Sequence, residues 1–73
     1  MNCEEISFTR HALERMFFRS IPPEQVHHII NNGEVIVEYP NDTPFPSILL
    51  LGYSGTRPIH VLVGRDSLKA TCY

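Results

Sequence analysis

The sequence lacks a long apolar run and a surplus of basic residues, and each absence excludes a class of protein. The longest apolar run, Ile48 to Leu51, is far too short to span a bilayer, and the N-terminal residues lack the apolar segment of an export signal. Six basic residues against eight acidic ones give a formal net charge of -2, so no overall positive field attracts nucleic acid or anionic lipid. We therefore expect a cytoplasmic protein with no membrane partner, and any nucleic-acid site must be local.

The chain has only two cysteines, Cys3 and Cys72, which stand near opposite ends without C-x-x-C spacing. They could meet on neighbouring strands and form a disulfide, but without a secretion signal a reducing compartment is favoured, and we expect half-buried free thiols. A metal site needs three or four convergent ligands, and no H-x-x-x-H, C-x-x-C or paired-carboxylate spacing occurs. We accordingly expect no metal and no cofactor.

The stretch from Phe8 to Ile21 has a strong helical period and organises the first part of the chain. Thr9 is suited to the N-cap, and Pro22 and Pro23 would stop the helix. The side expected to pack against the fold carries Leu13, Met16, Phe17 and Ser20. A helix is therefore predicted here, with one side buried and the other exposed.

A second helix is expected to begin at Pro23, because proline suits the first turn of a helix. Its apolar face carries Val26, Ile29 and Ile30, at positions i, i+3 and i+4. Gly33 can close this helix in the left-handed conformation at low cost. The 73 residues thus begin with a helix pair and form a single small domain, residues 1–73.

Four segments typical of strands follow the helices. They are Glu34 to Tyr39, Ile48 to Tyr53, Pro58 to Val63 and Leu68 to Tyr73. The continuous apolar run in the second segment suggests a central strand covered on both faces. The predicted fold is α+β, with two N-terminal helices packed on an antiparallel sheet of three to four strands. An open final strand would offer a sheet edge to a second copy, so a homodimer is one expected partner state.

The candidate site combines two histidines with several arginines. His11, Arg15 and Arg19 follow at a spacing of four, which stacks them as a row on the outward side of the first helix. With Arg57 and His60 they supply a base for the 2′-hydroxyl, an acid for the leaving oxygen and cations for the phosphate, as metal-independent RNA cleavage requires. Phe18 on the same outward face could stack on an unpaired base. We assign His11, His60 and Arg15 to catalysis, and Arg19, Arg57 and Phe18 to substrate binding.

A purely structural interpretation of the same residues stays open. Arg15 could pair with Glu24, Arg57 could solvate a turn, and His60 could form a hydrogen bond inside the sheet. Phe18 could then be a contact to a protein partner or a second copy. This alternative describes a non-catalytic protein-interaction module. His27 and His28 are expected to be surface histidines opposite the apolar face of the second helix.

The string His11-Ala12-x-x-Arg15-Met16-x-x-Arg19-x-Ile21 resembles a motif of a widespread prokaryotic family of small domains of unknown function. The resemblance extends to Val26 to Pro40, to LLLG at Leu49 to Gly52 and to RPIHVLV at Arg57 to Val63, and it covers most of the chain. That family is similar to the RelE-type toxin ribonucleases, which are paired with a small antitoxin. The resemblance implies a helix pair on an antiparallel sheet, with RNA as substrate and an antitoxin protein as partner.

The resemblance also assigns residues by position. His11, Arg15 and Arg19 match the helix motif of that family, and Arg57 and His60 match its RPxHVV segment. Members of that family generally continue past Cys72 and Tyr73 through a further strand, which this sequence does not include. The family pattern and the chemistry of the side chains therefore select the same positions.

Overall fold

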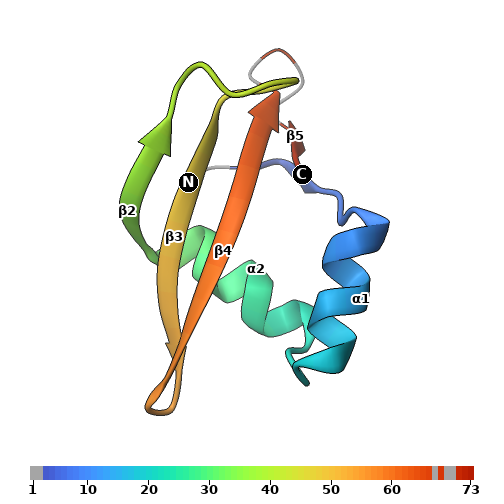
Figure 1. The fold of residues 1–73 in the computed structure, drawn as a ribbon, viewed down its shortest axis with the longest axis vertical. Helices are drawn as coiled ribbons and strands as arrows, with labels where there is room; N and C mark the ends of the chain where they lie inside the picture. Colours follow the sequence, from blue (N-terminus) through green and yellow to red (C-terminus); the bar gives the residue numbers. More distant parts are fainter. Residues whose placement is uncertain (1–2, 67, 69–70) are drawn as a thin grey trace.

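The computed structural model describes residues 3–66, 68 and 71–73, in which two helices and a five-stranded sheet are present (Figure 1). In chain order the elements are β1 (Glu5–Ile6), α1 (Arg10–Phe18), α2 (Pro23–Asn32), β2 (Glu34–Tyr39), β3 (Ser47–Ser54), β4 (Arg57–Asp66) and β5 (Thr71–Cys72). The α+β class is confirmed, but the described strands number five and not three to four. Neither described helix is long and apolar enough to cross a membrane.

The sheet is mixed, with the strand order β1-β5-β4-β3-β2. Strands β2 to β5 form antiparallel pairs, whereas β1 runs parallel to β5. The expected purely antiparallel sheet is therefore wrong, because a two-residue strand has no alternation that the sequence could reveal. The expected edge at the C-terminus is also wrong, since β1 covers β5 there. The predicted strand from Leu68 shortens to Thr71–Cys72, with Leu68 in a turn and residues 67, 69 and 70 outside the described chain.

The two cysteines form a disulfide, Cys3–Cys72, with a Cα–Cα distance of 5.8 Å. This bond contradicts the expectation of free thiols. The reason is that β1 pairs with β5, which brings the two ends of the chain together. A hydrogen bond from Ser7 N–H to the Cys72 carbonyl, 2.8 Å, extends this pairing by one residue. Cys72 is completely buried, so the bridge belongs to the core and not to the surface.

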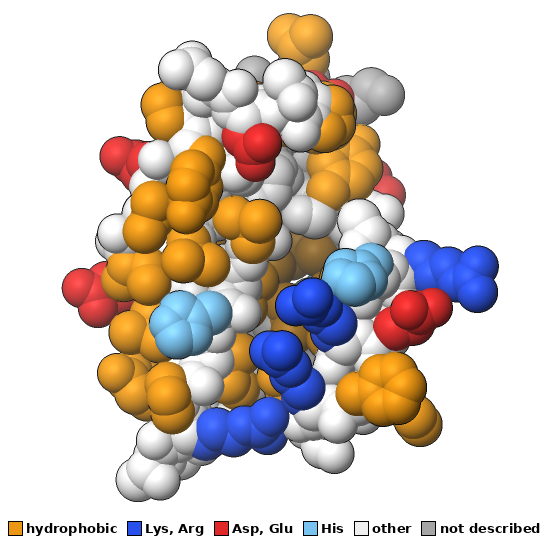
Figure 2. All heavy atoms as spheres, in the orientation of Figure 1, with side chains coloured by type: hydrophobic (Ala, Val, Ile, Leu, Met, Phe, Trp, Pro, Cys, Tyr) orange, Lys and Arg blue, Asp and Glu red, His pale blue; other side chains and the backbone are white. Residues whose placement is uncertain are grey.

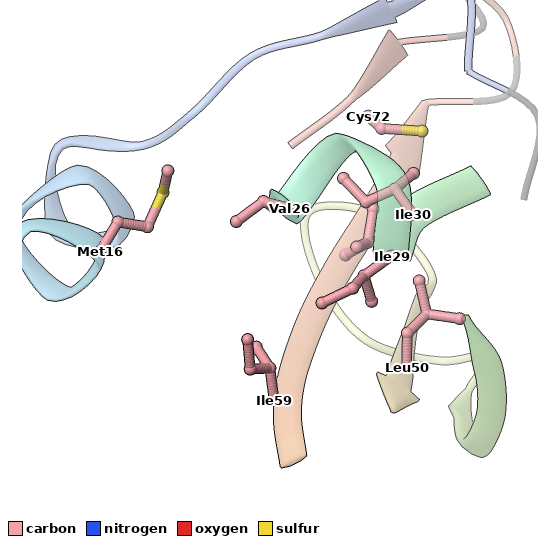
Figure 3. Close-up of a cluster of buried hydrophobic side chains, with 8 residues drawn as sticks. Met16, Val26, Ile29, Ile30, Leu50, Ile59 and Cys72 are labelled. Atoms are coloured by element: carbon pink, nitrogen blue, oxygen red, sulfur yellow. The ribbon is translucent and has the colours of Figure 1, made fainter. Parts of the chain in front are cut away.

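The core lies between α2 and one face of the sheet. Its buried apolar side chains, most of them labelled in Figure 3, are Met16, Val26, Ile29, Ile30, Leu50, Ile59, Val63 and Cys72. The predicted apolar face of α2 is therefore confirmed. Leu50 is buried while Leu49 and Leu51 on the other face are only half-buried, so β3 is an interior strand covered on one face and not on both.

Gly33 ends α2 in an extended conformation, with φ at -70°, and not in the expected left-handed one. Its N–H donates to the carbonyl of Ile29 at 2.7 Å. A Cβ at this position would lie 2.5 Å from the same Ile29 oxygen. Glycine is thus required here because a Cβ would meet the carbonyl of the last helical turn, and also the Leu51 carbonyl of β3 at 3.1 Å, and not because of a positive φ.

Helix α1 begins as predicted, because the Thr9 hydroxyl accepts from the N–H of Ala12 at 3.1 Å. It ends before the prolines, in a Schellman motif whose bonds run from Ser20 N–H to the Phe17 carbonyl, 3.2 Å, and from Ile21 N–H to the Met16 carbonyl, 2.9 Å. Ser20 takes the left-handed conformation that this motif requires, with φ at 55°.

The packing side predicted for α1 is mostly wrong. Met16 is buried, but Leu13 is 47% exposed and Phe17 is 82% exposed. The physical reason is the position of the helix: α2 crosses one face of the sheet, whereas α1 stands beside it and does not lie over the sheet (Figure 1). Only the side of α1 that carries Met16 meets the core, so the remaining apolar side chains stay in solvent.

Candidate functional site

Helix α1 presents the predicted row of polar side chains. His11 and Arg15 lie within the helix, and Arg19 is its C-cap residue. All three are exposed, and their spacing of four places each about one turn after the last. The neighbouring Arg10 instead pairs with Glu14, at 3.2 Å between Nε and Oε1. The row is therefore held by the helix backbone alone and is accessible to a ligand along its length.

Strand β4 carries the other two predicted residues. Arg57 starts the strand directly after the turn at Gly55 and Thr56, and His60 lies opposite Leu51 of β3. Side chains alternate along a strand, and Ile59 and Val63 are buried against α2, so His60 lies on the open face of the sheet. Arg57 shares the parity of Ile59 and therefore lies on the helix side. Because Arg57 and His60 are three residues apart, their exposed side chains lie on opposite faces of β4.

Figure 2 shows one face of the molecule, with side chains coloured by type. Basic side chains gather in the middle of the view, between the sheet and α1, and histidine side chains lie to either side of them. Among the described residues, Arg15, Arg19 and Arg57 form no ion pair and no side-chain hydrogen bond. In the described chain the alternative pairing of Arg15 with Glu24 is absent. This face is thus locally cationic although the chain carries a net charge of -2.

Phe18 lies at the end of α1 and is 83% exposed. Its ring meets that of Phe17 edge to face, with the ring centroids 5.9 Å apart. Next to Phe17, a surface hollow of about 460 Å³ has apolar walls that include Leu13, Met16 and Ile21. Two exposed aromatic rings at the end of the helix that carries Arg15 and is capped by Arg19 can stack on nucleic-acid bases or contact a protein.

The remaining histidines of α2 have structural neighbours. The ring of His27 lies 5.5 Å from that of Phe8 between centroids, and His28 Nδ1 lies 3.4 Å from Asn32 Nδ2. Both are exposed, as predicted. Among the residues that the structure describes, no three His, Cys, Asp or Glu side chains are placed to hold a metal ion.

The structure also shows a surface that the sequence interpretation missed. A hollow of about 630 Å³ lies beside the C-terminal half of β2, on the open face of the sheet, where Leu49 and Leu62 form part of its lining. These two residues are paired across β3 and β4. The signal in the sequence was the continuous apolar run of β3, which places Leu49 and Leu51 on the face opposite the buried Leu50 and so indicates a second apolar surface.

Comparison with known proteins yields one family. No curated protein and no solved structure matches the chain. A family model described as a domain of unknown function, DUF4258, matches residues 8–71. This range contains all six candidate residues on α1 and β4. Because the match covers most of the chain, the protein belongs to the DUF4258 family.

Proposed function

We propose that this domain is a toxin-like, metal-independent endoribonuclease. The single observation that carries the proposal is the cationic face on α1 and β4, where Arg15, Arg19 and Arg57 have no described ion pair and histidines flank the arginines (Figure 2). Unpaired guanidinium groups are suited to bind a polyanion, because their planar fork matches phosphate oxygens and stays charged. RNA is the polyanion that two histidines can also cleave.

The proposed reaction is transfer of the phosphodiester to the neighbouring 2′-oxygen. One of His11 and His60 removes the proton of the 2′-hydroxyl, and the resulting oxygen attacks the phosphorus. The bond from phosphorus to the 5′-oxygen breaks, and the other histidine donates a proton to that leaving oxygen. The products are a 2′,3′-cyclic phosphate and a free 5′-hydroxyl. Imidazole is suited to both steps because it gives and takes protons near neutral pH.

The remaining candidate residues would bind the RNA strand and stabilise the transition state of its cleavage. Arg15 lies one turn from His11 and would face the phosphate on which the charge of the transition state develops. Arg19 and Arg57 would hold adjacent phosphates of the strand. Phe18 offers an exposed ring for stacking on an unpaired base, which favours a single-stranded substrate.

We also propose a likeness to RelE-type toxins, with an antitoxin protein as partner and the cytoplasm as the place of action. Structural disulfides such as Cys3–Cys72 are commoner in oxidising compartments than in the cytoplasm. Counting free thiols in protein taken from cells under acid quench tests the compartment, because a cytoplasmic protein is expected to yield both thiols reduced.

The experiment is cleavage of 5′-labelled single-stranded RNA at low salt with EDTA present. His11→Ala and His60→Ala should each lower the rate about 10²–10⁴-fold, the usual contribution of a general acid or base. His28→Ala, an exposed histidine of α2, is the matched control and should cleave as the parent does. Replacing the ribose at the cleaved position by 2′-deoxyribose should abolish cleavage. Unchanged rates in both histidine variants would rule out the proposed mechanism.

One observation favours a second candidate function, a non-catalytic protein-interaction module. Phe17 and Phe18 expose more than four fifths of their surface side by side on α1, which is unusual for a solvated helix end. In that case Phe18→Ala should abolish association with a partner while His11→Ala leaves it intact. Loss of RNA cleavage with His11→Ala would favour the enzyme instead.

A further inference from the structure

Strand β2 is an uncovered edge of the sheet. Within the described chain it pairs only with β3, so its outer backbone N–H and C=O groups face no strand. All six of its residues are exposed, and Val35, Ile36, Val37 and Tyr39 expose between 38% and 46% of their surface. Proteins limit pairing at such an edge with charged side chains, a β-bulge, a cover or a very short strand, and β2 has charges and a bulge but neither a cover within the described chain nor a short length. The opposite edge, β1, has only two residues, whereas β2 spans roughly 20 Å at about 3.3 Å per residue.

The hollow beside β2 extends this edge onto the open face of the sheet. Leu49, Leu62 and Tyr39 give it an apolar lining, and the acidic residues Glu38 and Asp42 also border it. The Asp42 carboxylate already accepts from the Ser47 hydroxyl at 2.6 Å and from the Thr43 N–H at 3.0 Å. Glu38 has no ion pair among the described residues. This apolar lining with acidic residues at its border would suit a segment of another protein in which an apolar side chain is followed by a basic one.

The charges along β2 argue against a second copy as the occupant. Glu34 and Glu38 flank the apolar residues of the strand symmetrically about Ile36. An antiparallel pair of two copies centred on Ile36 would place Glu34 of each copy opposite Glu38 of the other, and like charges directly opposite destabilise a strand pair. A parallel pair in register would place each glutamate opposite its own counterpart. The β-bulge between Val35 and Val37 would add a second mismatch to either arrangement.

The distribution of charge over the rest of the surface points to a basic partner. In Figure 2 the acidic side chains at the left margin flank the apolar patch on the side of β2, and the basic side chains lie on the other side of that patch. The arginines of the proposed RNA site are on α1 and at the start of β4. The edge formed by β2 is therefore apolar and acidic, and it is separate from the cationic face.

We propose that β2 is a docking edge for an extended segment of a different protein, in which Lys or Arg residues flank a short apolar run. The segment adds a strand to the sheet, pairs its backbone with the outer side of β2, and places its basic side chains near Glu34 and Glu38. An apolar side chain of the segment enters the hollow over Leu49 and Leu62. This inference does not rest on RNA cleavage.

The test uses a fluorescein-labelled synthetic peptide, KKVTVTVKK, with the full chain, measured by fluorescence anisotropy and by ¹⁵N-¹H NMR spectra. Binding should shift the amide signals of β2 and slow their exchange with solvent. The double variant Glu34→Lys with Glu38→Lys should bind this peptide about tenfold or more weakly, because two attractive cross-strand pairs become repulsive. Ile36→Lys should block the edge, while Leu13→Lys on α1, which replaces a residue of similar exposure, should bind as the parent does.

Three results would overturn the proposal. The first is equal binding of the charge-reversed peptide EEVTVTVEE, which would show apolar adhesion without selection for charge. The second is peptide binding that survives Ile36→Lys. The third is a concentration-dependent dimer of the protein alone, seen by sedimentation, that Ile36→Lys dissociates, since the edge would then belong to a second copy. RNA cleavage by Ile36→Lys should equal that of the parent, so this proposal and the proposed ribonuclease activity fail separately.

Discussion

Reduction of the Cys3–Cys72 disulfide should remove a large share of the stability of this domain. The bond joins residues 69 positions apart, so it restricts the unfolded chain almost end to end. In the chain-entropy treatment a loop of about this length corresponds to about 15 cal/mol/K, or about 4.4 kcal/mol at 25 °C. A domain of this size usually has a total free energy of unfolding of about 4–11 kcal/mol. The reduced protein should therefore be marginally stable.

The assay is urea unfolding followed by circular dichroism, with and without the reductant TCEP. TCEP should lower the free energy of unfolding by about 4 kcal/mol in the parent. A variant with Cys3→Ala and Cys72→Ala should show no response to TCEP, which serves as the control. Local protection should follow the same pattern, because the amide of Ser7 bonds to the Cys72 carbonyl and should exchange faster once the bridge is open. Equal stability of the oxidised and reduced protein would refute this reasoning.

Three further changes test the backbone of the fold, each by urea unfolding at pH 7. Thr9→Ala should cost about 1 kcal/mol, because the N–H of Ala12 loses its cap, and no loss would contradict the capping role. Ser20→Gly should stabilise the domain by about 0.5–1 kcal/mol, since glycine tolerates the positive φ of 55°, and a destabilised variant would contradict this. Gly52→Ala should cost about 1–3 kcal/mol because its Cβ would clash with the side chain of Ile29, and a neutral effect would show that α2 can move aside.

The helices and the long strands were predictable because their signals are local. The apolar residues of α2 recur at helical spacing, and Thr9 is a capping residue directly before a periodic run. The predicted strand Glu34–Tyr39 has the same bounds as β2, since Gly33 and Pro40 flank its run of β-branched residues. Where residues within a few positions decide the structure, the sequence alone was sufficient.

The features that were missed depend on contacts between distant parts of the chain. Neither the two residues of β1 nor the disulfide carries a local pattern, and both result from the chain ends meeting beside β4. Phe17 looked like a core residue by period, but the position of α1 beside the sheet leaves it in solvent. The alternation of β4, by contrast, was predictable, and it places His60 on the face of the sheet opposite Ile59 and Val63.

The most direct test of the central claim is an NMR titration of ¹⁵N-labelled protein with a short single-stranded RNA whose 2′-hydroxyls are replaced by hydrogen to prevent cleavage. At low salt, where phosphate contacts are strongest, signals of His11, Arg15, Arg19, Arg57 and His60 should shift together. Signals of His28 and of β2 should stay in place. Shifts of that set would show that α1 and β4 form one phosphate-binding face. No shifts in it, or shifts confined to β2, would contradict the ribonuclease account.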